Sequence, residues 1–369
     1  MKVKVICTII AICFVVQSSY AFGPIGHSWV GAVAELVLAK KDPTSAKKVG
    51  DLLHGMSLSA AANLPDKIKE WDKKPPTDPN SFHLAKKYAD IEAQLVAFWK
   101  ANPLQNDETK PNHHWFHYTD ISIFQTKYAE NEKGSSRWDI VHLIPYCARV
   151  LQGKESENNE RKITKPVALI LLTHYLGDIH QPLHVGADYF DAAGNQVNPD
   201  QKPGFDDEGG NGLTLEIQVV DERGHNSTEQ FKLHGFWDGE AVESASELVA
   251  AETLNNPAYK DLKPSDAATK YFADKEPVNW NITSQTPVDN WAIAWANEIL
   301  PIAAQAHQRL AFSNVNIVTS HGKQTAVGLA GEKQMPDGIT YRNWAGNVIK
   351  NEIQRGGWRL AALLSQSVK

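Results

Sequence analysis

Residues 172–184 place three side chains that could bind a metal ion in one short segment. His174 and Asp178 are four residues apart, so a helix would project both from one face on successive turns. Pro182 ends such a helix and leaves His184 free to turn toward a second ion. One pair of this kind is usually a structural hydrogen bond. Three candidate ligands within an apolar helix instead favour a metal site, because buried charges are normally paired or metal-bound.

Further candidate ligands recur along the chain. His234 and Asp238 repeat the four-residue spacing, and residues 112–120 are dense in histidine and aromatic side chains. His27 begins a helical pattern, where a histidine is as often solvated as bound, and Asp66 follows a proline, where a carboxylate usually caps a helix. Imidazole and carboxylate ligands without a thiolate are compatible with zinc.

Residues 1–21 are typical of a secretory signal peptide. Lys2 and Lys4 give a basic start, and the apolar run 5–16 is too short to span a bilayer. Residues 19–21 fit a small-x-small cleavage pattern, so we expect a mature chain that begins at Phe22. An uncleaved anchor is the alternative. We therefore expect a periplasmic or secreted protein with no membrane span after cleavage.

The composition argues against some binding partners and against stabilisation by disulfide bonds. Without the two lysines of residues 1–21, the 37 basic residues fall to 35 against 43 acidic ones, so the net charge changes from −6 to −8. This balance argues against broad electrostatic binding of duplex DNA. Cys7 and Cys13 lie in the predicted signal peptide, so Cys147 alone remains and no intramolecular disulfide is expected.

The hydrophobic periodicity predicts a mainly α protein, with one domain over residues 22–369 and a small β-hairpin. Asp42 and Asp139 are expected to cap helices. The predicted helices are 43–53, 84–101, 139–152, a buried central helix that starts near 166, 239–254, 289–311 and 342–364. Residues 214–220 alternate as a strand, and residues 230–233 are expected to pair with it.

Seven short motifs, which together contain most of the candidate ligands named above, are distributed over most of the chain. They are F-G-P-I-G-H (22–27), L-P-D-K-I-K (64–69), W-F-H-Y-T-D (115–120), H-Y-L-G-D-I-H-Q-P-L-H (174–184), G-G-N (209–211), L-H-G-F-W-D (233–238) and G-G-W-R-L-A-A-L-L (356–364). In this order they resemble the secreted zinc-dependent single-strand nucleases and 3′-nucleotidases, the family of nucleases S-one and P-one. That family shares its helical fold with bacterial zinc phospholipase C. Most fungal members carry disulfides, which are not expected in this chain, so a bacterial protein is expected.

The resemblance implies three zinc ions per chain. The implied ligands are Asp66, His117, His174 and Asp178 for one ion, His184, His234 and Asp238 for another, and His27, Asp178 and the backbone amino nitrogen and carbonyl oxygen of Phe22 for the last. The family usually has tryptophan in place of Phe22. His83 is a rival for His117, because the stretch that follows Asp66 is longer than the family pattern. His113, His114 and His180 are interpreted as surface residues or as neighbours of the ligands.

The resemblance also implies hydrolysis of single-stranded DNA and RNA, with metal-activated water attacking phosphorus and products that carry a 5′-phosphate. 3′-Nucleotides are further substrates, and no stable protein partner is implied. Asp120 is expected near the attacking water, Lys69 on the phosphate, Tyr118 stacked on a base, and Asn211 either on the base or shaping its loop. Asp120 could otherwise be a cap and Lys69 a solvated residue. The alternative functions are a zinc phospholipase C and a zinc-binding protein that has lost its activity.

Overall fold

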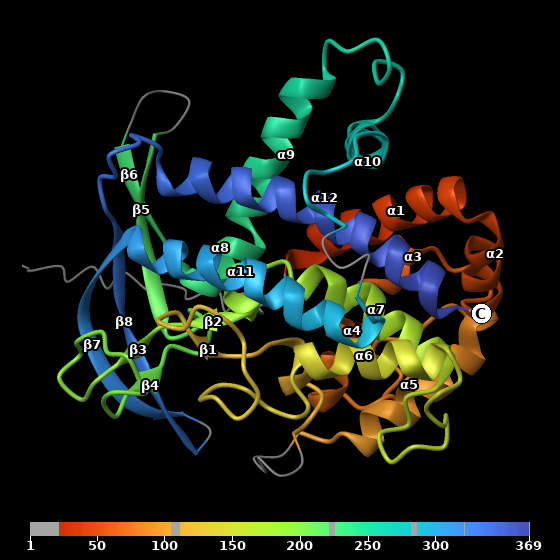
Figure 1. Cartoon of the computed structure of the whole chain (residues 1–369), viewed down its shortest axis with the longest axis horizontal. Coiled ribbons are helices and arrows are strands. Elements are labelled where there is room, and N and C mark those ends of the chain that lie inside the picture. Colours follow the sequence, from red (N-terminus) through yellow and green to blue (C-terminus); the bar gives the residue numbers. More distant parts are fainter. Residues whose placement is uncertain (1–21, 105–110, 221–225, 282–285, 321, 369) are drawn as a thin grey trace, which may run out of the picture.

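The computed structural model describes residues 22–104, 111–220, 226–281, 286–320 and 322–368. The predicted signal peptide, residues 1–21, lies outside the described residues. Figure 1 shows a helical body with a small sheet at one end. The helices are α1 (Gly23–Lys41), α2 (Pro43–Leu52), α3 (Leu58–Ala61), α4 (Leu64–Lys67), α5 (Ala89–Ala101), α6 (Ile140–Leu151), α7 (Lys165–Asp178), α8 (Leu233–Asp238), α9 (Glu240–Thr253), α10 (Pro264–Asp274), α11 (Trp291–Gln308) and α12 (Tyr341–Ser367).

Short 3₁₀ helices and strands complete the described chain. The 3₁₀ helices are η1 (Ile68–Asp72), η2 (Lys86–Tyr88), η3 (Trp115–His117), η4 (Pro182–His184) and η5 (Val288–Asn290). The strands are β1 (Ile121–Ser122), β2 (Gly186–Ala187), β3 (Tyr189–Phe190), β4 (Phe205–Asp206), β5 (Leu213–Val220), β6 (Asn226–Lys232), β7 (Leu310–Ser320) and β8 (Lys323–Glu332). The mainly α class predicted from the sequence is confirmed.

Helix α7 lies at the centre of the helical body. Pro166 occupies its first turn, where a missing backbone N–H costs little, and every residue from Val167 to Asp178 is buried. The helix packs against α1, α5, α6 and α12, so it has no solvent-exposed polar face. It ends at Asp178, and η4 begins at Pro182. The predicted end of the central helix before this proline is confirmed.

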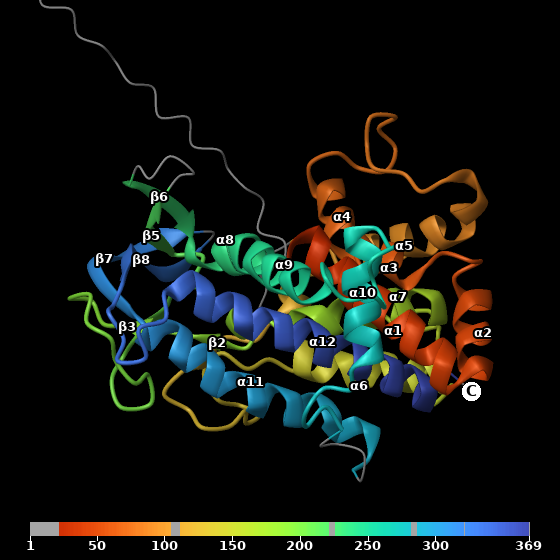
Figure 2. The same ribbon diagram turned by 90° about the horizontal axis from the view of Figure 1, so that it is seen from above.

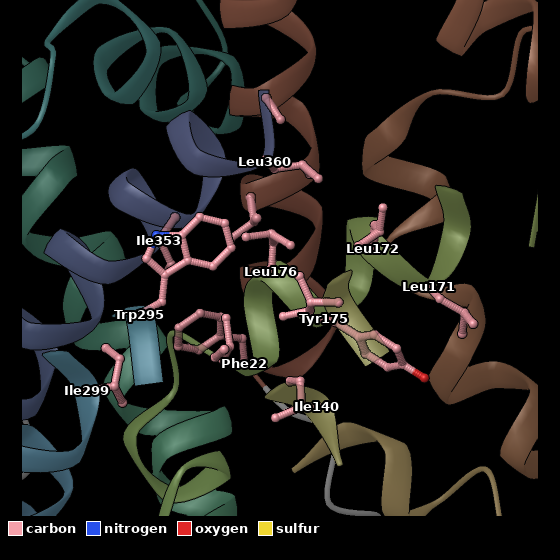
Figure 3. Packing of buried hydrophobic residues seen from close by; sticks show 14 of the residues in the cluster. Phe22, Ile140, Leu171, Leu172, Tyr175, Leu176, Trp295, Ile299, Ile353 and Leu360 are labelled. Carbon is pink, nitrogen blue, oxygen red and sulfur yellow. The ribbon is translucent and has the colours of Figure 1, made fainter. Parts of the chain in front are cut away.

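One continuous cluster of buried apolar residues connects α1, α7, α11 and α12. Figure 3 shows Phe22, Leu176 and Trp295 among its packed side chains. All three are fully buried, and burial of a large apolar side chain contributes roughly 1.5–3 kcal/mol. Phe22, the first described residue, is therefore held in the core and fixes the start of α1.

Two predicted helix caps are confirmed. The Asp42 carboxylate accepts from the backbone N–H of Ser45 at the start of α2, and the Asp139 carboxylate accepts from Val141 and His142 at the start of α6. Each cap satisfies N–H groups that have no partner within the helix. These contacts explain why both helices start where the sequence predicts.

Among the described residues, no helix combines the length and the apolar composition needed to cross a membrane.

The sheet has four strands in the order β6-β5-β8-β7 (Figures 1 and 2). Strands β5 and β6 are antiparallel, with Thr214 opposite Lys232, so the predicted hairpin is confirmed. Strand β8 adds to β5 in parallel, and β7 pairs with β8 in an antiparallel hairpin. This second hairpin was not predicted from the sequence. The hydrophobic pattern predicts a helix up to residue 311, whereas α11 ends at Gln308. Helix α10 was also not predicted.

Candidate metal centre

Helix α7, the 3₁₀ helix η3 and the short helix α4 bring His174, His117 and Asp66 together. The Nδ1–H of His174 donates to the carbonyl oxygen of Ala62 at 2.6 Å, which leaves its Nε2 with a free lone pair. That Nε2 lies 2.9 Å from Nδ1 of His117, 3.1 Å from Oδ2 of Asp178 and 3.7 Å from Oδ1 of Asp66. The ligand atoms of Asp66, His117 and His174 lie within 4.8 Å of one another, close enough to hold one metal ion.

Helix α8 and η4 form a second group from His184, His234 and Asp238, whose ligand atoms lie within 4.8 Å of one another. The Nδ1–H of His184 donates to the carbonyl of His117 at 2.8 Å, and that of His234 donates to the carbonyl of Gly209 at 2.7 Å. The Nε2 atoms of the two imidazoles are therefore unprotonated in the neutral rings, and they face each other at 3.1 Å. Two lone pairs at this separation repel unless a cation lies between them.

A third group joins the start of α1 to the end of α7. The Nε2 of His27 lies 3.3 Å from Oδ1 of Asp178, and the backbone N–H of Phe22 interacts with the Asp238 carboxylate. Both ring nitrogens of His27, Oδ1 of Asp178 and Oδ2 of Asp238 are buried and make no hydrogen bond within the described chain. Buried polar atoms are rarely left without a partner. A metal ion between His27 and Asp178 would satisfy Nε2 of His27 and Oδ1 of Asp178, and an ion held by His184 and His234 would satisfy Oδ2 of Asp238.

Gly177 allows α1 and α7 to approach closely at this point. A Cβ atom at this position would lie 2.5 Å from Nδ1 of His27, inside van der Waals contact. The glycine thus makes room for the His27 ring directly beside Asp178, and any larger residue would displace one of the two helices.

The ligand–ligand distances fit zinc. Zinc–nitrogen and zinc–oxygen bonds of about 2.0–2.1 Å in a tetrahedral arrangement place ligand atoms about 3.3 Å apart. The Nε2 of His234 lies 3.1 Å from His184 and 3.4 Å from Oδ2 of Asp238, which matches this spacing. His184, His234 and Asp238 are therefore able to bind zinc with little rearrangement.

Burial keeps most of these imidazoles neutral, which metal binding requires. It lowers the pKa of His234 to about 3 and also lowers the pKa of His27 and His184. It holds the pKa of His117 well below the usual value. His174 is the exception: although burial opposes its charge, the carboxylates of Asp178 and Asp66 raise its pKa.

The two central carboxylates respond to burial in opposite ways. Burial opposes ionisation of Asp178, but His174 and His184 hold its pKa well below the usual range. Burial raises the pKa of Asp238 well above the usual range. A bound cation would reverse the shift at Asp238, since a positive charge favours the ionised carboxylate.

The residues expected to act on substrate lie around these groups rather than within them. The Nζ atom of Lys69 lies 2.8 Å from Oδ1 of Asp66 and is partly exposed. Asp120 is buried next to Gly209, and burial among acidic neighbours raises the pKa of its carboxyl to about 8. Tyr118 is half-buried. Burial raises the pKa of its phenol well above the usual value, and the nearby negative charge of Asp120 raises it further. The Asn211 side chain donates to the carbonyl of Glu208, which shapes its loop.

The other histidines considered in the sequence analysis occupy different positions. The half-exposed ring of His83 pairs with Glu92 at 2.8 Å, and His83 belongs to none of the candidate metal groups among the described residues. His180 is fully buried, donates through Nδ1 to the carbonyl of Leu176, and accepts at Nε2 from Arg359. His113 and His114 form a separate group of potential ligands with Asp72.

Two contacts at the site were not predicted from the sequence. The side-chain amide of Gln181 donates to Oδ1 of Asp238 at 3.0 Å and orients that carboxylate. The buried pair of Asp207 and His307, 3.0 Å apart, supports the loop that contains Gly209. A glutamine between two candidate ligands was a usable signal for the first contact. Nothing local in the sequence connects the two residues of the second.

The fold and the site together define a helical protein with a buried cluster of histidine and aspartate groups able to bind metal ions. Residues 22–369 match the family model described as S1/P1 nuclease, and the chain belongs to this family.

The chain is similar to three proteins of Arabidopsis thaliana. It is 27% identical to Endonuclease 4 over 175 residues, which cover 44% of this chain and 47% of that protein. It is 27% identical to Endonuclease 2 over 147 residues, which cover 38% and 42%. It is 23% identical to Endonuclease 3 over 268 residues, which cover 70% and 73%. The first two matches thus span less than half of the length of these relatives.

Proposed function

We propose that this chain is a zinc-dependent phosphodiesterase that hydrolyses single-stranded DNA and RNA to 5′-phosphate products and also removes phosphate from 3′-nucleotides. The observation that carries the proposal is the position of Asp178. One of its oxygens faces His27 at 3.3 Å, and the other lies 3.0 Å from His117 and 3.1 Å from His174. A carboxylate placed in this way can bridge two ions, as paired metal sites in phosphodiesterases require. Family membership and the names of the similar proteins support the nuclease activity.

In this proposal the chain binds three zinc ions. One would be held by Asp66, His117, His174 and Asp178; one by His184, His234 and Asp238; and one by His27, Asp178 and the backbone of Phe22. Bound zinc would polarise the phosphoryl oxygens and lower the pKa of water. The buried His and Asp side chains fix the positions of the ions, and their dry surroundings strengthen each electrostatic interaction.

Three side chains would act on the substrate. Lys69, partly exposed beside Asp66, would bind a non-bridging phosphate oxygen. Asp120 would lie near the attacking water. Burial raises the pKa of its carboxyl to about 8, and the positive charge of nearby metal ions would favour the ionised form that can accept a proton from that water. Tyr118 would stack on a base, and stacking contributes roughly 1–3 kcal/mol per base without regard to sequence.

The preference for single strands follows from this arrangement. A duplex buries the faces of its bases, so a stacking residue next to a metal centre selects unpaired nucleotides. The net charge of the chain, −6, opposes general attraction to duplex DNA, and the metal ions would supply local positive charge. Secretion to the periplasm or the medium is part of the proposal and is supported by the predicted signal peptide.

Hydrolysis of four substrates tests the proposal. Single-stranded DNA, single-stranded RNA, duplex DNA and phosphatidylcholine vesicles are compared with the zinc-loaded protein and with the chelated protein. We expect hydrolysis of both single strands, a much lower rate on the duplex, no release of phosphocholine, and loss of activity on chelation. Hydrolysis of the vesicles alone would identify a phospholipase C, and no hydrolysis of any substrate would identify an inactive zinc-binding protein.

A further inference from the structure

Asp72, His113 and His114 form a group of potential ligands apart from the proposed three-zinc centre. Their ligand atoms lie within 4.8 Å of one another, and none of the three residues belongs to the other groups. Asp72 is the last residue of η1, and the two histidines directly precede η3. We infer that this group binds a fourth zinc ion, which holds the chain together beside the catalytic centre.

The geometry resembles that of the proposed centre. The Nε2 of His113 lies 3.3 Å from Oδ1 and 3.2 Å from Oδ2 of Asp72. The Nε2 of His114 lies 2.7 Å from the same Oδ2. The first two distances match the separation of about 3.3 Å between ligands of tetrahedral zinc, and the third needs a shift of about 0.6 Å. Two imidazoles and one carboxylate with an open fourth position are a common zinc ligand set.

A hydrogen bond from Trp99 fixes the orientation of the Asp72 carboxylate. The indole N–H of Trp99 donates to Oδ1 of Asp72 at 2.8 Å. A hydrogen bond to the second oxygen of a ligating carboxylate is the usual way in which proteins aim it at a metal. Oδ2 is thereby left to face two imidazole nitrogens.

Hydrogen bonds alone give each Nε2 atom a partner, because the two oxygens of Asp72 can accept from both imidazoles and from Trp99. What favours a metal is instead the convergence of two imidazoles on one carboxylate, which is a zinc ligand set. The pair of His83 and Glu92 shows the ordinary alternative, in which one imidazole meets one carboxylate at 2.8 Å. His114 is 36% exposed at its side chain, so an ion and a water ligand can reach the group from solvent.

The position of the group gives the ion a structural role. η1 directly follows α4, which contains Asp66, and η3 ends at His117. An ion bound by Asp72 and the two histidines would tie these two segments together. It would therefore fix two ligands of the proposed catalytic centre without touching the substrate.

The number of zinc ions per chain tests the inference. The mature protein, stripped with chelator, reloaded with zinc and desalted, is measured by plasma mass spectrometry. His114→Asn and Asp72→Asn should each bind one zinc fewer per chain than the unsubstituted protein, while the matched control His83→Asn should bind the same number. Because the comparison is a difference, it does not depend on how many ions the catalytic centre holds. Equal zinc content in His114→Asn and the unsubstituted protein would overturn the inference.

A second measurement does not depend on any variant. Crystals of the zinc-saturated protein should give an anomalous peak at the zinc edge between Asp72, His113 and His114. The absence of that peak, in crystals whose proposed centre shows zinc, would exclude the fourth site even if both variants failed to fold.

Discussion

The imidazole rings of His27 and His174 lie nearly parallel, with centroids 3.9 Å apart and an interplanar angle of 12°. The two rings come from α1 and α7, and each faces a different oxygen of Asp178: Oδ1 for His27 and Oδ2 for His174. The stack therefore directs the two oxygens of one carboxylate toward two separate groups of ligands. Asp178 is the residue on which the proposed metal centre depends most.

Asp178→Asn should lower the zinc content by at least one ion and reduce turnover of single-stranded DNA by roughly 10²-fold or more. The amide loses the negative charge that two ions would share, and even outer-shell changes at metal sites cost 10–100-fold. Zinc analysis and initial rates provide the measurement. His83→Ala is the matched control. Among the described residues the half-exposed ring hydrogen-bonds to Glu92 and to the backbone carbonyl of Asp78, and it belongs to none of the candidate metal groups, so this variant should retain both zinc and activity.

Removal of zinc should abolish activity and lower the melting temperature. Without metal, the Nε2 atoms of His184 and His234 face each other at 3.1 Å, and Oδ1 of Asp178 and Oδ2 of Asp238 have no hydrogen-bond partner in the described part of the chain. Ligands that bind only the folded state stabilise it by about 4 kcal/mol at 1,000 times their dissociation constant. Calorimetry before and after chelation measures the shift. An unchanged melting temperature, with zinc loss verified, would contradict the proposed centre.

A residue added before Phe22 should remove the zinc ion held by His27. A free α-amino group can lose its proton to bind metal near neutral pH, whereas a peptide nitrogen has no available lone pair. The Phe22 nitrogen already lies against the Asp238 carboxylate. The chain that begins at Phe22 is compared with one extended by a single alanine, by zinc content and by hydrolysis of single-stranded DNA. Equal zinc and equal rates would exclude Phe22 from the site.

The pair of His307 and Asp207 should make stability depend on pH. Burial opposes the charge of His307, but Asp207 at 3.0 Å raises its pKa from 6.5 to about 9. The stabilisation is fully present below pH 6.5 and is lost as the pH rises through about 9, because the unfolded state then binds fewer protons than the folded one. At 1.36 kcal/mol per pKa unit the effect is about 3 kcal/mol.

The double variant Asp207→Asn/His307→Gln removes both charges of this pair and isolates the effect. The difference in free energy of unfolding between the unsubstituted and the double-variant protein should be largest near pH 6 and decline toward pH 10. Urea denaturation across this range measures it. A difference that stays constant with pH would show that His307 is not charged in the folded protein.

Local patterns predicted the helical part of the fold well. Asp42 and Asp139 cap their helices as expected, and the apolar run after Pro166 forms the buried helix α7. These features depend on residues close together in the chain. The spacing of His174 and Asp178, and of His234 and Asp238, likewise follows from helix geometry alone, and each pair lies within one group of potential ligands.

Features that depend on distant residues were not predicted. Strands β7 and β8 alternate only weakly, and β7 contains a register shift between Ser313 and Asn316, which disturbs the period of two. The contact of Asp72 with His113 and His114 joins residues about forty positions apart, and neither segment reveals the other. The hydrogen bond of Gln181 to Asp238 likewise joins residues that are far apart in the chain, so its partner could not be predicted from the local sequence.

The parallel pairing of β5 with β8 has a consequence for folding. The pairing aligns Leu213 with Gly328, and the N–H of Gly328 donates to the carbonyl of Gly212, next to the turn whose Gly209 carbonyl holds His234. A ligand of the proposed centre is thus supported by a segment about a hundred residues further along the chain. Contacts between such distant segments form slowly, because a long loop must close first. The apo chain should therefore acquire its helices early and its zinc affinity late, only after β8 has been synthesised and has docked.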